Sequence, residues 1–261
     1  MTFQDACAAV CAPGSMFEIQ ETEVFGHTSK VFAGTPPNIR ALFALAGART
    51  DEFIIFEDER WAMPRVIEMI GQIGHALVND LGVGKGDRVA IAMRNYPEWI
   101  AAFAAITSVG AVAVPMNAWW VTEEMVFALE DSGSNVVIAD DERLGRMQAA
   151  ALGEIDATIV VVRPEGALPD GVLSLDELLT PGATLPDVDI DPDEDMTILY
   201  TSGTTGRPKG AVSTHRAVLS ALLAFAARAA VGSLREPEDP ASVEEGGAPQ
   251  TAFMLCVPLF H

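Results

Sequence analysis

Short apolar runs alternate with helix-length segments through the middle of the chain, and this alternation restricts the fold more than any other feature. Residues 88–93, 111–114, 136–139 and 158–162 are rich in Val, Ile and Ala and have the length of buried strands. Parallel strands need a crossover between them, which is usually a helix. The order therefore predicts an α/β fold that is doubly wound, with mostly parallel sheets sandwiched by helices.

Composition divides the 261 residues into three parts. Residues 1–162 carry the alternating pattern and are predicted to form a first α/β subdomain. Residues 163–195 are rich in Pro, Gly and Asp, and we interpret them as an acidic connection. Residues 196–261 would then begin a second α/β subdomain, which is incomplete within this sequence. In it, residues 235–250 have the composition of a mobile surface insertion, and 252–257 are predicted to be a strand with Cys256 inside.

The charge balance excludes some partners. The chain has 16 Lys and Arg against 37 Asp and Glu, a net charge of -21, which repels nucleic acid. Three unclustered cysteines indicate reduced thiols and a cytoplasmic location. The most apolar stretch, residues 99–114, is shorter than the ~20 residues that span a bilayer, so we expect no transmembrane segment. The first residues lack the basic and long apolar regions of a signal peptide.

One stretch carries most of the chemical information: residues 200–210 read YTSGTTGRPKG. Its glycines let the backbone approach a ligand, and its N–H groups and hydroxyls can surround phosphate oxygens beside the charge of Lys209. It is not a Walker loop, because that pattern, G-x-x-x-x-G-K-S/T, leads into a helix, whereas a second strand is expected from Gly210. The alternative is an ordinary surface hairpin, which does not require so many hydroxyls next to a lysine.

This stretch resembles the phosphate-binding signature of the acyl-adenylate-forming (AMP-binding) enzymes, which include acyl-CoA synthetases, luciferases and the adenylation domains of peptide synthetases. Residues 257–261, VPLFH, are similar to the next motif of that family, whose terminal aromatic or His sits near the acyl pocket. Residues 82–115 and 123–140 are similar to the first subdomain of acyl-CoA synthetases. The resemblance covers essentially the whole chain and corresponds to the N-terminal portion of the family.

The resemblance implies an acid–thiol ligase that uses ATP, Mg²⁺ and coenzyme A to convert a carboxylic acid first to an acyl-adenylate and then to an acyl-CoA. A medium- or long-chain fatty acid is the expected acid. Lys209 is expected to support the phosphates electrostatically, and Thr201 to contact magnesium. His261 is placed at the boundary of acyl group and adenylate, with a purely structural hydrogen bond as its alternative. The residues expected to bind the β- and γ-phosphates are Thr201, Ser202, Gly203, Thr204, Thr205 and Gly206.

Some alternatives stay open at this point. The magnesium Glu, ribose Asp and C-terminal Lys of the family have no counterpart in these 261 residues, so we expect this part alone not to turn over. An adenylation domain that loads a carrier protein, and a truncated nucleotide-binding or interaction module without catalysis, are the rival functions. The acyl chain, the choice between CoA and a carrier protein, and a homodimer are also left open.

Overall fold

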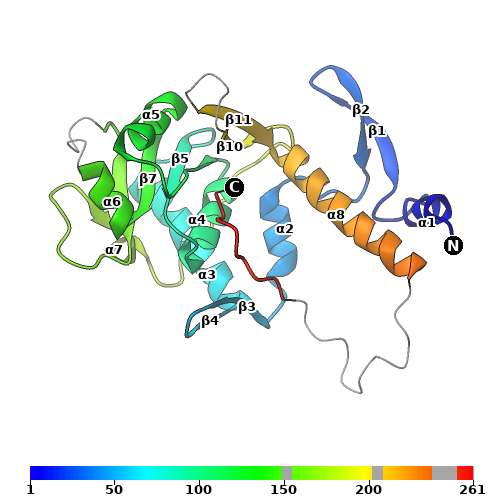
Figure 1. Cartoon of the computed structure of the whole chain (residues 1–261), viewed down its shortest axis with the longest axis horizontal. Helices are drawn as coiled ribbons and strands as arrows, with labels where there is room; N and C mark the ends of the chain where they lie inside the picture. The colour runs from blue at the N-terminus through cyan, green and yellow to red at the C-terminus, as the bar shows by residue number, and fades with distance from the viewer. Residues whose placement is uncertain (149–154, 202–207, 237–251, 261) are drawn as a thin grey trace. The chain divides into compact units, whose positions relative to one another are not determined.

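The computed structural model describes residues 1–148, 155–201, 208–236 and 252–260 (Figure 1). The chain divides into two compact units: Met1–Pro37 with Arg216–Cys256, and Asn38–His215 with Val257–His261. Nearly all of the expected insertion at 235–250 lies outside the described residues, as do residues 202–207 and His261. The second unit contains both sequence motifs and therefore the candidate site.

A seven-stranded sheet forms the centre of the second unit, in the order β11-β10-β6-β5-β7-β8-β9. Its ladders are parallel among the described residues, except for the antiparallel pair of β10 and β11. This confirms the predicted α/β fold, because each apolar run became a strand within about two residues of its expected place. The strands are β5 (Arg88–Ala92), β6 (Val112–Pro115), β7 (Ser134–Asp140), β8 (Thr158–Val162), β9 (Leu173–Ser174), β10 (Asp195–Thr201) and β11 (Lys209–Thr214).

Helices cover both faces of this sheet (Figure 1). Successive strand side chains point to opposite faces. In β5, Ile91 therefore joins the apolar cluster under α3 and α4, while its neighbours Ala90 and Ala92 join the cluster under α5 and α6. The bounds of these helices are α3 (Met63–His75), α4 (Pro97–Ser108), α5 (Thr122–Ser132) and α6 (Asp141–Gln148).

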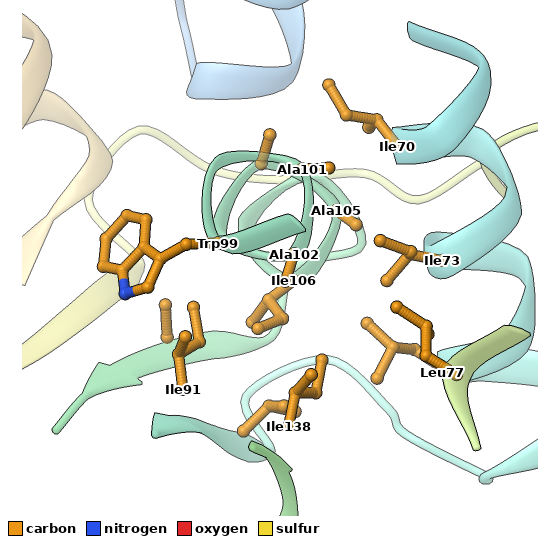
Figure 2. Close-up of a cluster of buried hydrophobic side chains, with 14 of the residues drawn as sticks. Ile70, Ile73, Leu77, Ile91, Trp99, Ala101, Ala102, Ala105, Ile106 and Ile138 are labelled. Carbon is orange, nitrogen blue, oxygen red and sulfur yellow. The ribbon is translucent and has the colours of Figure 1, made fainter. Parts of the chain in front are cut away.

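The core between α3, α4 and the sheet is densely packed (Figure 2). Helix α4 presents alanines that are fully buried, which lets α3 and the sheet approach it closely from two sides. A π-helical turn, η1 (Ala76–Asp80), continues α3 and contributes Leu77. Gly82 then takes φ 68° and ends this helical segment, as expected of a helix C-cap. The residues labelled around this core are Ile70, Ile73, Leu77, Ile91, Trp99, Ala101, Ala102, Ala105, Ile106 and Ile138.

Smaller elements complete the second unit. Strands β3 (Glu52–Phe56) and β4 (Glu59–Ala62) form an antiparallel hairpin directly before α3. Helix α2 (Ile39–Ala46) begins at Asn38, whose side chain accepts a hydrogen bond from the backbone N–H of Ala41. The short α7 (Leu175–Leu178) follows β9.

The first unit is smaller. It holds α1 (Phe3–Val10), the antiparallel pair β1 (Ile19–Val24) and β2 (His27–Phe32), and all but the first residue of α8 (His215–Arg235). Ala6 and Val10 of α1 pack against Ala227 and Val231 of α8. Helix α8 has 21 residues and a mean hydropathy of 1.8 over its apolar part, of which only 17% is buried. By length and composition it could cross a membrane. The sequence predicts no transmembrane segment, and length and composition alone do not overturn that prediction.

Two expectations differ from the structure. The sequence placed residues 196–261 in a second subdomain, yet β10 pairs in parallel with β6, so β10 and β11 extend the same sheet as β5–β8. The segment 163–195 therefore does not separate two sheets. The predicted strand at 252–257 is wrong: no described strand pairs with it, Met254 is 90% exposed and Cys256 is exposed. Its apolar composition resembles a strand, but a strand also needs a ladder partner.

Candidate functional site

Strands β10 and β11 hold the two ends of the candidate phosphate loop. Thr201 and Lys209 are Cα partners in this antiparallel pair, and the Thr201 hydroxyl donates a long hydrogen bond of 3.5 Å to the Lys209 carbonyl. Both residues are exposed. The other predicted phosphate ligands, Ser202, Gly203, Thr204, Thr205 and Gly206, lie outside the described residues. The loop joins strand to strand, as the sequence predicted.

The base of this loop is fixed by Tyr200. Its hydroxyl donates a 2.7 Å hydrogen bond to Asp131 of α5, and its ring meets Trp120 edge-to-face at 5.8 Å. Burial, aided by the hydrogen bond to Asp131, raises the pKa of the Tyr200 hydroxyl, so it remains a donor. Opposite it in β11, a Cβ on Gly210 would come within 2.7 Å of the Ile198 side chain. Glycine there allows the two strands to close tightly under the loop.

A buried ion pair lies at the carboxyl edge of the sheet. The guanidinium of Arg143 is 3.0 Å from the Asp140 carboxylate, and each side chain is only 4% exposed. Asp140 ends β7 and also accepts hydrogen bonds of 3.0 Å from the backbone N–H groups of Arg94 and Arg143. Arg94 follows β5, the neighbour of β7. The pair therefore ties together two strand ends whose crossovers leave in opposite directions, where open α/β sheets bind ligands.

Two arginines of α6 also hold the loop that follows β6. Arg143 Nε donates to the Ala118 carbonyl at 2.9 Å, and Arg146 Nη1 donates to the carbonyls of Ala118 and Trp120 at 2.8 and 3.0 Å. Trp120 is 8% exposed and packs beneath the sheet, whereas Trp119 is 64% exposed. The loop is therefore anchored on both sides of a solvent-facing indole.

The second motif reaches the same edge. Asn95, in the loop after β5, donates from Nδ2 to the Val257 carbonyl at 3.0 Å and accepts from the Leu259 N–H at 2.8 Å. Phe260 is 7% exposed, and its ring meets Trp119 edge-to-face at 5.5 Å. Because β10 runs parallel to β6, its last residue, Thr201, also lies at the carboxyl edge. The structure thus brings Thr201 and its partner Lys209, which flank the phosphate loop, and residues 257–260 of the second motif to one edge of one sheet.

Sequence reasoning missed Asn95, Asp140 and Arg143. Asp140 and Arg143 follow an apolar run at i and i+3, a spacing that could have indicated an ion pair at a helix start. Asn95 had no such signal, because its partners lie 162 and 164 residues away. His215 is the first residue of α8, and His261 lies outside the described residues. No group of three or more His, Cys, Asp or Glu that could hold a metal is found in the described part of the chain.

The family model described as AMP-binding enzyme matches residues 42–261. The chain belongs to this family. The matched range contains both motifs, so the predicted relation to the AMP-binding family is confirmed. The fold agrees as well, since the described sheet and its helices match solved structures of adenylate-forming ligases.

Several relatives of this chain are named CoA ligases. It is 42% identical over 149 residues to the long-chain-fatty-acid–CoA ligase FadD13 of Mycobacterium tuberculosis, covering 56% of this chain and 28% of that protein. It is 39% identical over 142 residues to the 3-hydroxybenzoate–CoA/4-hydroxybenzoate–CoA ligase of Thauera aromatica, covering 54% and 27%. The acids in these names differ in kind.

Among solved structures, the inhibitor-bound N-terminal domain of FACL13 from Mycobacterium tuberculosis matches this chain with a TM-score of 0.60 and 32% identity. That match covers 73% of this chain and 48% of the other. The anthranilate CoA ligase AuaEII in complex with anthranoyl-AMP matches with a TM-score of 0.63 and 26% identity, covering 69% and 36%. In each comparison the chain spans less than half of the relative.

Proposed function

We propose that this chain provides the phosphate-binding part of an ATP-dependent, AMP-forming ligase that activates a carboxylic acid and transfers the acyl group to coenzyme A. The observation that carries the proposal is the β10–β11 pair at the carboxyl edge of the sheet, which holds the ends of a TSGTTGRPK loop in a member of the AMP-binding family. A strand pair anchored through Tyr200 holds the two ends of this loop, Thr201 and Lys209, next to each other.

The proposed reaction starts with attack of the acid's carboxylate on the α-phosphorus of ATP, which breaks the bond to pyrophosphate and forms acyl-AMP. The thiol of CoA then displaces AMP. In the first step, negative charge develops on the leaving pyrophosphate, so cation and N–H contacts to its oxygens lower the barrier. We assign these contacts to Lys209 and to the loop residues Thr201, Ser202, Gly203, Thr204, Thr205 and Gly206.

Magnesium in such a site would neutralise phosphate charge. The ion is commonly held by one or two protein oxygens together with substrate phosphates and water. Thr201, with its exposed hydroxyl at the loop's end, is the residue we propose for it from this loop. A single hydroxyl fits a site in which the phosphates supply most ligands.

For the acid, we propose a medium- or long-chain fatty acid, supported by the 42% identity to FadD13. Phe260, and His261 after it, would lie at the boundary between the acyl group and the adenylate. An aromatic acid is the second candidate, because the hydroxybenzoate ligase is nearly as similar, at 39%. Transfer to a carrier protein stays the rival function and a homodimer stays open, while a cytoplasmic location remains a prediction from the sequence.

Lys209→Ala is the direct test of the phosphate site. We expect the 261-residue chain to bind MgATP or magnesium pyrophosphate about 10-fold more weakly after this substitution, because a charge-assisted contact worth about 1.4 kcal/mol is lost. Isothermal titration calorimetry measures both ligands. Lys30→Ala is the matched control, since it removes the same charge from exposed strand β2 of the other unit and should leave binding unchanged.

Equal affinity in the wild type and Lys209→Ala would remove Lys209 from the site. A parallel assay with decanoate and 4-hydroxybenzoate measures acyl-AMP and acyl-CoA. We expect nucleotide binding without turnover from these residues. Turnover by the chain would contradict that expectation, and its preferred acid would decide between the two acid classes.

A further inference from the structure

Residues 257–260 reach the edge of the sheet without forming a strand. No ladder pairs them with β5 or β6 in the part of the chain that the structure describes. A segment without ladder bonds needs other contacts to keep its position, because ordering each backbone residue costs roughly 1–2 kcal/mol. Leu259 packs beside the apolar cluster of α3 and α4, but one apolar contact does not fix the direction of the backbone.

The side-chain amide of Asn95 fixes the backbone direction of residues 257–259. It binds the carbonyl of Val257 and the N–H of Leu259, the two backbone groups on either side of Pro258. In a parallel ladder, one residue likewise accepts from and donates to the two residues that flank its partner. An asparagine carries both a donor and an acceptor, so one side chain can replace a strand residue here. Pro258 has no N–H, so its nitrogen leaves no donor unpaired.

Asn95 is held firmly enough to act as a clamp. The N–H of Arg94, the preceding residue, donates to buried Asp140, and the N–H of Tyr96 donates to the Arg94 carbonyl at 2.7 Å. Beyond the clamp, Phe260 is 7% exposed and lies edge-on to Trp119, whose loop is anchored by Arg143 and Arg146. The clamp and the aromatic contact therefore rest on the same buried ion pair.

We propose that Asn95 is a positioning residue of the acid site, which sets the place of Phe260 by clamping the backbone around Pro258. The acid-site role rests on the proposed function, whereas the clamp itself does not. Loss of Asn95 would release the aromatic pair and weaken binding of the acid. It would leave the phosphate loop on β10 and β11 unaffected, because Asn95 makes its contacts elsewhere on the edge.

Asn95→Ala tests the clamp by hydrogen exchange. We expect the Leu259 amide to exchange at least 10-fold faster in this variant, while the amides of β5 keep their protection. Asn79→Ala is the matched control, because Asn79 is an exposed asparagine whose amide binds only within its own helical segment, at His75. Equal exchange at Leu259 in wild type and Asn95→Ala would overturn the clamp. If Asn95→Ala loses β5 protection, Asn95→Leu replaces it, since it removes both the donor to Val257 and the acceptor of Leu259 while keeping the side-chain volume.

A second measurement separates positioning from general stabilisation. In protein labelled with 5-fluorotryptophan, the ¹⁹F signal of Trp119 should shift in Asn95→Ala, while that of Trp61, buried elsewhere, should not. Decanoate affinity should fall about 10-fold with MgATP affinity unchanged. An unmoved Trp119 signal would overturn the positioning role. Normal decanoate affinity in a variant whose Leu259 amide exchanges faster would overturn the link to the acid site. If the wild type does not bind decanoate, the proposed function is contradicted, while the exchange data still decide whether Asn95 acts as a clamp.

Discussion

Replacing Asp140 by alanine should lower the free energy of unfolding by about 2–3 kcal/mol. The substitution leaves the Arg143 guanidinium, whose side chain is 4% exposed, buried without the carboxylate that faces it at 3.0 Å. It also removes the acceptor of the backbone N–H of Arg94. Arg143 would keep the Glu142 carboxylate at 2.9 Å and the Ala118 carbonyl, but Glu142 is half-exposed, so the guanidinium loses its one fully buried carboxylate partner. The loss therefore exceeds that of an exposed ion pair.

Urea denaturation followed by circular dichroism measures this effect. Asp51→Ala is the control, because Asp51 forms its ion pair with Arg49 on the surface, and the variant should stay close to the wild type. The double variant Asp140→Ala/Arg143→Met should be more stable than Asp140→Ala alone, since it also removes the buried guanidinium charge of Arg143. A loss below 1 kcal/mol for Asp140→Ala, or no recovery in the double variant, would show that the pair does not organise this edge.

The parallel sheet was predictable because its signal is local. Runs such as residues 136–139 are apolar on both faces, and β7 is buried on both faces. The β10–β11 pair was predictable for the same reason, since its two short apolar runs stand close together on either side of the motif. The run at 252–257 has a similar composition, yet it forms no strand. A strand also needs a free sheet edge to pair with, and the local sequence does not show whether such an edge is within reach.

The site was only partly predictable. Thr201 and Lys209 flank the loop where the motif placed them, but the roles of the loop residues stay predictions. The groups that organise the edge act across the chain: Asn95 meets Leu259 over 164 residues, and Arg143 reaches Ala118 over 25. These contacts form between loops that meet at the carboxyl edge of the sheet. Which loops meet there depends on the strand order, so the contacts can be identified only once that order is known.

Lowering the pH from 7 to 5 should remove about 2 kcal/mol of stability through His215 alone. The side chain is fully buried, and burial lowers the pKa of His215 to about 4, against a smaller opposing effect of the Glu194 charge. Nδ1 accepts a 3.3 Å hydrogen bond from the N–H of Ile39, and Nε2 has no hydrogen-bond partner among the described residues. Protonation of Nδ1 would therefore break a bond and place a charge in a buried site.

The sign follows from comparing the two states. The unfolded chain takes up the histidine proton near its ordinary pKa of about 6.5, while the folded chain resists until about pH 4. The contribution of His215 is thus complete above pH 6.5 and is lost as the pH falls towards 4. Urea midpoints at pH 7, 6 and 5 measure the slope. His215→Asn keeps an acceptor for Ile39 but cannot titrate, so its stability should change by about 2 kcal/mol less over this range, whereas His27→Asn, on exposed β2, should follow the wild type. Identical slopes for the wild type and His215→Asn would mean that His215 is solvated in the folded protein, because only desolvation of the ring separates its two pKa values in this direction.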